Sequence, residues 1–260
     1  ITCKEDFIAS LPFQLTGAQK RVIDEICADF TSGKLMMRLV QGDVGSGKTA
    51  VAAAAMYIAV KNGYQAAIMA PTEILAAQHF ETFTSFFEDK GINVALLTGS
   101  TKKKKRLYEK IKSGEIDIVI GTHAVIQKDV EYKKLGLVVA DEQHRFGVEQ
   151  RAAFSNKGDN PHCLVMTATP IPRTLALILC GDLDISALDE LPPGRKKVET
   201  YAVGEGMRTR INNFIEKNVR DGGQVYVVCP LIEETASSDL QNAADKAKSL
   251  AEIFPDFRIG

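Results

Sequence analysis

The sequence predicts an α/β protein with a parallel β-sheet that has helices on both faces. Between residues 35 and 167, short apolar runs rich in β-branched residues recur. Such nearly continuous apolar runs are typical of strands buried on both faces of a parallel sheet. The stretches between the runs have helical spacing. A glycine-rich segment, GDVGSGKTA (42–50), joins the first run to an alanine-rich stretch, as a turn from strand to helix would.

Six strands and three long helices are expected in this region. The strands are LMMRLVQ (35–41), AAIMA (66–70), NVALLT (93–98), IDIVI (116–120), LVVAD (137–141) and CLVMT (163–167). The helices are TAVAAAAMYIAVK (49–61), EILAAQHFETFTSFFEDK (73–90) and KKRLYEKIKSG (104–114). Because ligands bind at the carboxyl ends of the strands in such sheets, the residues after each strand are the candidates for function.

The composition limits the classes of function. The chain has 260 residues, 45% of them apolar and 25% charged, and its net charge is −1. A nearly neutral chain has no global basic field, so any nucleic-acid site must be local. Five scattered cysteines without a C-x-x-C pair argue against a zinc site or a disulfide framework and favour the cytoplasm. The longest apolar run, AVAAAAMYIAV, is too short to span a membrane, so we expect no membrane partner.

The segment after the first strand has the spacing of a phosphate-binding loop, with the alternative of a purely structural glycine turn. The lysine would reach the β and γ phosphates of a nucleotide, and the following threonine would hold Mg²⁺. We therefore expect ATP and Mg²⁺ as cofactors. The expected binding residues are Gly42, Gly45, Ser46, Gly47, Lys48 and Thr49.

Acidic residues follow the strand LVVA in the sequence DEQH. Asp141 is expected to orient Mg²⁺, and Glu142 to act as the base that activates the attacking water. Together with Lys48 and His144, they form the predicted catalytic set. The alternative is an ordinary acidic strand end, which the phosphate loop nearby disfavours.

Polar residues also follow the other strands. Small hydroxyl and backbone donors at such ends can contact sugar–phosphate oxygens without reading bases. The expected DNA-binding residues at these ends are Thr72, Thr98, Gly99, Gly121, Thr122 and His123. The turn TATP after CLVM is expected to have a coupling role, in which Thr167 and Thr169 sense the γ-phosphate region and pass that state to a neighbouring surface. Each alone is also compatible with an ordinary polar strand end, and only their shared edge favours function.

Two further stretches have open interpretations. In LPFQLTGAQK, Phe13 could stack on adenine and Gln19 could bond its edge, or both could serve helix capping and packing. In HRFGVEQR (144–151), Arg145 and Phe146 could couple DNA to the catalytic acids, or Phe146 could lie in the core. The lysine run KKKKR (102–106) is expected to be mainly a solvated helix face.

A linker divides the chain. ELPPGRK (190–196) combines two prolines and a glycine and interrupts the strand–helix alternation. We expect a first lobe at residues 1–190, a linker at 191–197, and the start of a second α/β lobe at 198–260. In that second lobe, VETYAV and QVYVVCP would be strands flanking a helix around RTRINNFIEKNVRDG. Two strands are too few for a doubly wound domain, so we expect a longer protein.

The motifs occur in the order found in superfamily 2 helicases. VVADEQHRFGVEQR followed by LVMTATPIPRTLAL, with FQLTGAQKRVIDEI upstream, resembles most closely the bacterial members that act on branched DNA. The resemblance implies a RecA-like motor fold, ATP hydrolysis, and a branched DNA partner such as a stalled fork or a Holliday junction. It also implies a wedge domain and a complete second lobe with an arginine finger, which this sequence does not contain.

Three alternatives remain at this point. A transcription-repair coupling factor has a similar motor that translocates on double-stranded DNA, although its counterpart of DEQH usually ends in Gln. A phosphate-loop enzyme for a small substrate, such as a kinase, would carry an arginine cluster in its lid, and none follows a strand here. A nucleotide-gated binding module would act on partners without moving along DNA.

Overall fold

The computed structural model describes residues 3–141, 160–169, 183–190, 194, 198–229 and 243–260. The chain divides into two compact units, residues 1–195 and 196–260. Glu142, His144, Arg145 and Phe146 lie outside the described residues, as does most of the expected linker at 191–197.

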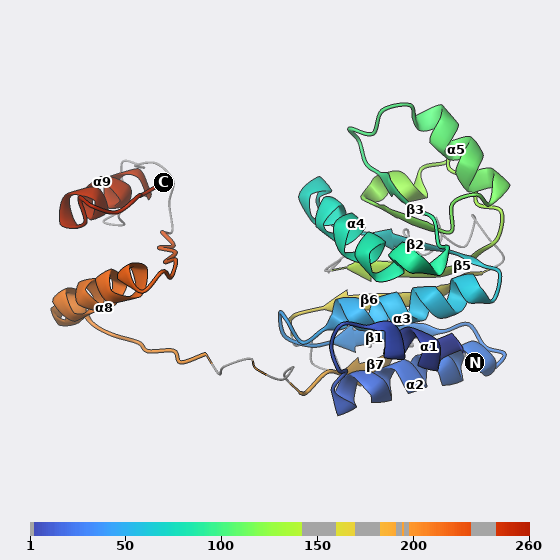
Figure 1. Ribbon diagram of the computed structural model, residues 1–260, viewed down its shortest axis with the longest axis horizontal. Coiled ribbons are helices and arrows are strands. Elements are labelled where there is room, and N and C mark those ends of the chain that lie inside the picture. Colours follow the sequence, from blue (N-terminus) through green and yellow to red (C-terminus); the bar gives the residue numbers. More distant parts are fainter. Residues whose placement is uncertain (1–2, 142–159, 170–182, 191–193, 195–197, 230–242) are drawn as a thin grey trace. The chain divides into compact units, whose positions relative to one another are not determined.

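A parallel sheet forms the centre of the first unit (Figure 1). Its strand order is β3-β4-β2-β5-β6-β1-β7, and every neighbouring pair is parallel. The strands are β1 (Met37–Gln41), β2 (Gln65–Met69), β3 (Val94–Leu97), β4 (Ile118–Gly121), β5 (Leu135–Asp141), β6 (His162–Thr167) and β7 (Asp184–Ala187). The six expected strands and the α/β class are confirmed, while the edge strand β7 was not predicted.

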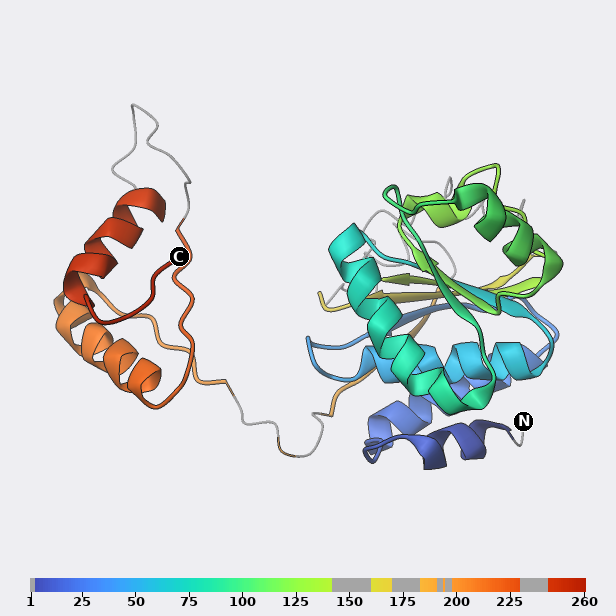
Figure 2. The same ribbon diagram turned by 45° about the horizontal axis from the view of Figure 1, so that its top comes forward.

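Helices cover both faces of this sheet, as expected (Figures 1 and 2). One face packs against α1 (Cys3–Ser10), α2 (Gly17–Thr31), α3 (Lys48–Lys61) and α4 (Glu73–Phe87). The other face packs against α5 (Lys104–Ser113) and the short 3₁₀ helix η2 (His123–Ile126). A second 3₁₀ turn, η1 (Glu88–Lys90), continues α4. Alternate strand residues supply the two cores, since Ile68 faces one and Met69 the other.

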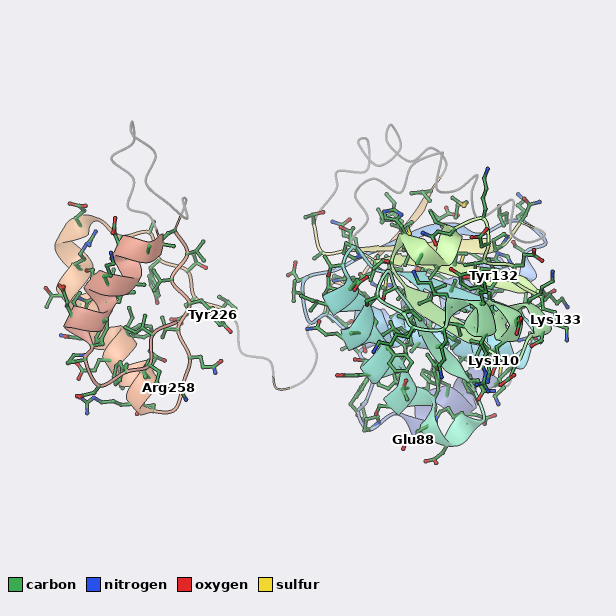
Figure 3. The ribbon with its side chains drawn as sticks, turned by 90° about the horizontal axis from the view of Figure 1, so that it is seen from above. Glu88, Lys110, Tyr132, Lys133, Tyr226 and Arg258 are labelled. Atoms are coloured by element: carbon green, nitrogen blue, oxygen red, sulfur yellow. The ribbon has the colours of Figure 1, made fainter. Side chains whose placement is uncertain are left out.

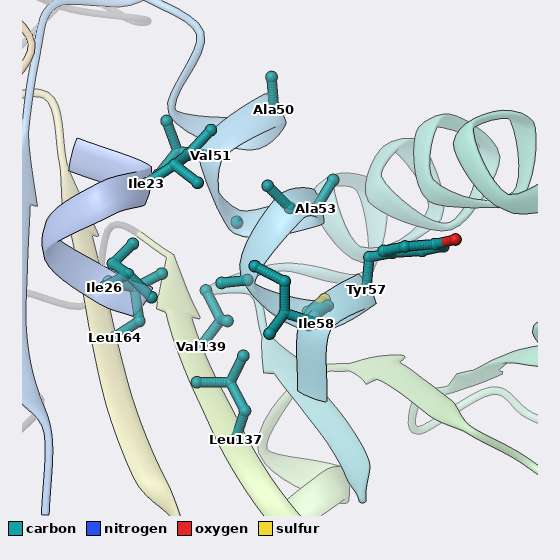
Figure 4. Packing of buried hydrophobic residues seen from close by; sticks show 14 of the residues in the cluster. Ile23, Ile26, Ala50, Val51, Ala53, Tyr57, Ile58, Leu137, Val139 and Leu164 are labelled. Atoms are coloured by element: carbon teal, nitrogen blue, oxygen red, sulfur yellow. The ribbon is translucent and has the colours of Figure 1, made fainter. Parts of the chain in front are cut away.

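The alanine-rich helix α3 is buried along most of its length. Small side chains such as Ala53 let it pack closely between the sheet and the outer helices (Figure 4). Val51 and Ile58 lie in the same cluster as Val139 of β5 and Leu164 of β6. Burial on nearly all sides explains why this sequence shows no polar face, and it fixes the start of α3 against the sheet edge.

The second unit contains the 3₁₀ turn η3 (Glu205–Met207), α8 (Arg208–Arg220) and α9 (Ala243–Ile253). The predicted helix in RTRINNFIEKNVRDG is confirmed as α8. The strands predicted at 198–203 and 224–229 are wrong for the described residues, which form no strand in either range. Apolar side chains there stay exposed, and Tyr226 is 88% exposed (Figure 3). A β-strand needs a hydrogen-bonding neighbour, and the described residues of this unit supply none for these segments.

Candidate functional site

The carboxyl ends of all the strands lie along one edge of the sheet, because the strands are parallel. Three adjacent strands, β1, β6 and β5, end at the phosphate-loop motif, at Thr167 and at Asp141. The next three strands, β2, β4 and β3, end just before Thr72, Thr122 and Thr98. The structure therefore divides the predicted site residues between two halves of one continuous edge.

The phosphate-loop segment turns tightly between β1 and α3. The Gly42 N–H donates to the Thr167 carbonyl at 3.1 Å, which ties the start of the loop to the end of β6. Gly45 and Gly47 have φ angles of +79° and +86°, a region that favours glycine. A Cβ atom at Gly42 would lie 2.5 Å from Ser46 Oγ, so the loop closes over a space that only glycine leaves open.

The inner surface of this loop has the donors that a phosphate group requires. Lys48 is 9% exposed, and its Nζ donates to the carbonyl oxygens of Gly42 and Asp43. Ser46 Oγ is buried and has no hydrogen-bond partner within the described part of the chain. A buried lysine and an unpartnered hydroxyl at a helix N-terminus fit a bound anion. Thr49, partly buried in the first turn of α3, adds a hydroxyl beside them.

Gln19 joins the loop to α2. Its Oε1 accepts from the Thr16 N–H at 2.9 Å, and Thr16 Oγ1 accepts from the Gln19 N–H at 3.2 Å, which makes a capping box. The same side chain donates from Nε2 to the Ser46 carbonyl at 2.8 Å. The capping interpretation of Gln19 is therefore confirmed, while its contact with adenine stays a prediction. Phe13 is 43% exposed, and its ring meets the edge of Phe86 at a centroid distance of 6.2 Å.

Asp141 is the last residue of β5 and is 8% exposed. His79 of α4 lies against it, with Nε2 2.5 Å from Asp141 Oδ2. His79 is not among the residues predicted from the sequence. Its position two helical turns after Thr72 could have indicated that it lies on the same face of α4 as the strand ends.

The oxygen donors in this half suit Mg²⁺. A hydroxyl at Thr49 and a carboxylate at Asp141 are hard ligands of the kind that Mg²⁺ prefers. Among the described residues, no three His, Cys, Asp or Glu side chains form a group that could hold a metal. Since Mg²⁺ is usually held by one or two protein ligands together with water and phosphate oxygens, this donor set fits a metal that binds with a nucleotide.

The other half of the edge is a set of linked loops. Thr72 caps α4 by accepting from the Leu75 N–H at 3.2 Å. Glu73 accepts from Ser100 Oγ at 2.8 Å and from the Ser100 N–H at 3.2 Å, and these hydrogen bonds lower the pKa of the Glu73 carboxyl. Thr98 is 3% exposed, with Oγ1 3.0 Å from Ser100 Oγ. The loops after β2 and β3 are thus held together.

Two predicted glycines in this half meet close neighbours. A Cβ at Gly121 would lie 1.9 Å from the Leu97 carbonyl oxygen, so the close approach of β4 and β3 already requires glycine there. A Cβ at Gly99 would lie 2.8 Å from Glu73 Oε1. The packing thus explains Gly121 without any ligand, whereas Gly99 belongs to the loop that Glu73 holds.

Four predicted residues lie at the end of β6 and in the turns after β4 and β6. Thr122 is partly buried at the start of η2, and the imidazole of His123 beside it is exposed. After β6, the hydroxyls of Thr167 and Thr169 lie 2.9 Å apart, and Thr167 Oγ1 also accepts from the Thr169 N–H at 3.2 Å. This compact turn lies between the phosphate loop and Asp141.

Comparison with known proteins reveals close relatives. The chain is 57% identical, over 95% of its length, to the ATP-dependent DNA helicase RecG of Bacillus subtilis (strain 168), and covers 37% of that protein. It is 51% identical to the RecG of Aquifex aeolicus (strain VF5), over 97% of the chain and 32% of that protein. A solved structure of RecG bound to a three-way DNA junction matches 97% of the chain with a TM-score of 0.82 and 45% identity, and 33% of that structure is covered.

The chain thus spans about a third of the length of these relatives. No helix within the described ranges is long and apolar enough to cross a membrane. The profile of the DEAD/DEAH box helicases matches residues 16–178, which include the phosphate loop, Asp141 and Thr167. The chain therefore belongs to the DEAD/DEAH box helicase family.

Proposed function

We propose that the chain is the ATP-binding part of a DNA helicase or translocase that acts on branched DNA, such as stalled replication forks and Holliday junctions. Membership of the family implies nucleotide binding, and the proposal specifies ATP with Mg²⁺. The observation that carries it is the shared sheet edge, where the phosphate loop, Thr167 and Asp141 adjoin the loops at Thr72 and Thr98. A nucleotide bound at one half would therefore lie only a few strands away from DNA bound at the other half.

Each residue of the nucleotide half has a proposed task. Lys48 would exchange its bonds to the loop carbonyls for phosphate oxygens, and the loop N–H groups would hold the remaining phosphate charge. Thr49 and Asp141 would hold Mg²⁺, which when bound neutralises charge on the phosphates. Glu142, outside the described residues, would take a proton from the attacking water. His144 would pass changes at the phosphate to the following segment.

The other half of the edge would track the DNA backbone. Hydroxyl and backbone donors of the loops at Thr72, Thr98 and Thr122 suit sugar–phosphate oxygens rather than base edges. His123 is exposed at the same edge, and Arg145 and Phe146 are proposed to couple this half to the catalytic acids. The similarity to RecG bound to a three-way junction supports a branched substrate.

The proposed motor would consist of this chain and further parts of a longer protein. Residues 1–190 would be the first motor lobe, 191–197 the linker, and 198–260 the beginning of the second lobe. The remainder of that lobe would supply an arginine finger, which contributes a factor of about 10³ to 10⁵ in related phosphoryl transfers. A wedge domain would engage the branch point. We propose that the protein acts in the cytoplasm.

The test is ATP turnover by a protein that contains this chain together with the rest of the relatives' length. We expect turnover to rise on addition of a three-way junction and to rise less with linear duplex of the same length. Equal stimulation by both would favour a double-stranded DNA translocase of the coupling-factor type. No stimulation by any DNA would contradict the motor and favour a nucleotide-gated binding module.

A further inference from the structure

His79 lies where α4 meets the end of β5. Its Nε2 is 2.5 Å from Asp141 Oδ2, and each of the two side chains is 12% exposed. The imidazole also packs against the ring of Phe83, with centroids 5.9 Å apart in an edge arrangement. Phe83 is fully buried in the core. The imidazole is thus held between a fixed aromatic ring on its own helix and the carboxylate at the sheet edge.

This contact restricts the Asp141 carboxylate. An aspartate side chain can rotate about its last bond with little energy cost, since that rotation is broad and roughly two-fold. Because a carboxylate only accepts, His79 must donate the hydrogen from Nε2. One donor on Oδ2 therefore restricts the rotation of the carboxylate and, with it, the positions that Oδ1 can take.

Helix α4, which carries His79, contacts both halves of the sheet edge. It begins at Thr72 and Glu73, where Glu73 holds the Ser100 loop, and it reaches Asp141 about 9 Å further along its axis. Helix α4 packs against β3 and β4, so its position is fixed by the sheet. His79 is therefore placed by the fold itself and not by a surface loop.

We propose that His79 is a positioning residue that orients Asp141 for Mg²⁺ bound with the nucleotide. This inference rests on the proposed function, because it assumes a magnesium–nucleotide complex at Asp141. Hydrogen bonds to ligating carboxylates fix their orientation, and loss of such a partner typically weakens metal binding by about 10- to 100-fold. Among the described residues, the hydrogen-bond and ring partners of His79 are Asp141 and Phe83 and not the phosphate loop, so we expect nucleotide binding without metal to be independent of His79.

The test compares two amide substitutions that differ in reach. The amide nitrogen of His79→Gln extends about as far as Nε2 and keeps a donor for Asp141, whereas that of His79→Asn is too short. Gln78→Ala on the exposed side of the same helix is the matched control. Calorimetry would measure ADP affinity in EDTA and over a series of Mg²⁺ concentrations, and the electron paramagnetic resonance of Mn²⁺ would measure bound metal directly.

We expect His79→Asn to raise the Mg²⁺ concentration needed for half-maximal tightening by about tenfold. His79→Gln and Gln78→Ala should match the parent chain, and all of them should bind ADP equally in EDTA. An unchanged metal requirement in His79→Asn would overturn the proposal, as would an equal loss of affinity in EDTA and in Mg²⁺. If the parent chain itself bound no nucleotide, both the proposed function and the role of His79 would be wrong. If the parent bound nucleotide and His79→Asn behaved like it, only the role of His79 would be wrong.

Discussion

Replacing Gly47 with alanine tests whether the phosphate loop and Gln19 form one packed unit. Gly47 has a φ angle of +86°, and a Cβ there would lie 2.1 Å from Gln19 Nε2. That nitrogen is buried and donates to the Ser46 carbonyl, while Oε1 of the same amide bonds the Thr16 N–H. The added methyl group must therefore displace the Gln19 amide, and we expect both of its hydrogen bonds to break because the amide is buried.

The expected loss of stability can be worked from these contacts. The left-handed conformation of an alanine costs about 1 kcal/mol. Loss of the hydrogen bond to Ser46 costs about 1 kcal/mol. Loss of the hydrogen bond from the Thr16 N–H to Gln19 Oε1 costs about 1 kcal/mol more. Gly47→Ala should therefore lower the free energy of unfolding by about 3 kcal/mol.

Gly33→Ala is the matched control, because Gly33 has a φ angle of +73° and no atom lies within 4 Å of its added Cβ. This control should show only the backbone strain, about 1 kcal/mol. Urea unfolding followed by circular dichroism measures both. In a Gln19→Ala background, Gly47→Ala should lose its clash and cost about 1 kcal/mol. If Gly47→Ala costs no more than Gly33→Ala, or costs the same in both backgrounds, the loop and Gln19 do not form one packed unit.

Three further predictions concern catalysis, pH and DNA. Glu142→Gln should keep ATP binding but stop turnover in the longer protein, because an amide cannot accept the proton of the attacking water; near-normal turnover would assign the base elsewhere. Burial lowers the pKa of His162, whose Nδ1 accepts from the Met36 N–H at 2.9 Å. The contribution of neutral His162 to the free energy of unfolding should thus be complete above the ordinary histidine pKa of about 6.5. It should decrease as the pH drops below that value. His162→Asn should flatten the change in melting temperature between neutral and mildly acidic pH, and an unchanged slope would contradict this. Replacing Lys102 to Lys105 with Gln should change DNA affinity little at moderate salt, whereas a large loss with a smaller salt dependence would show direct contact.

Much of the first unit could be predicted because its signals are local. A continuous apolar run is typical of a buried parallel strand, and the spacing from Gly42 to Thr49 between an apolar run and an alanine-rich stretch predicts a tight turn from strand to helix. The edge strand β7 was not predicted because its sequence, DISA, is short and is not a continuous apolar run. The strands expected at 198–203 and 224–229 failed for the opposite reason, since apolar alternation indicates a tendency to pair but supplies no partner.

Specific side-chain pairings could not be predicted, since they depend on the tertiary structure. Periodicity places His79 on a helix face but cannot name Asp141, 62 residues away, as its partner. Gln65 is a second example, because its buried amide donates to the carbonyls of Ile111 and Ile116 and accepts from two backbone N–H groups before β5. In both cases only the folded chain brings the partners within reach.

Calorimetric binding of ATP with Mg²⁺ to this chain and to its Lys48→Ala variant tests most directly whether this sheet edge is the nucleotide site. Lys61→Ala at the other end of α3 is the control for removal of a lysine from the same helix. We expect the parent and Lys61→Ala to bind ATP, and Lys48→Ala to bind it much more weakly or not at all. Equal ATP affinity in Lys48→Ala and the parent, with both chains folded, would contradict the assignment of this edge as the nucleotide site.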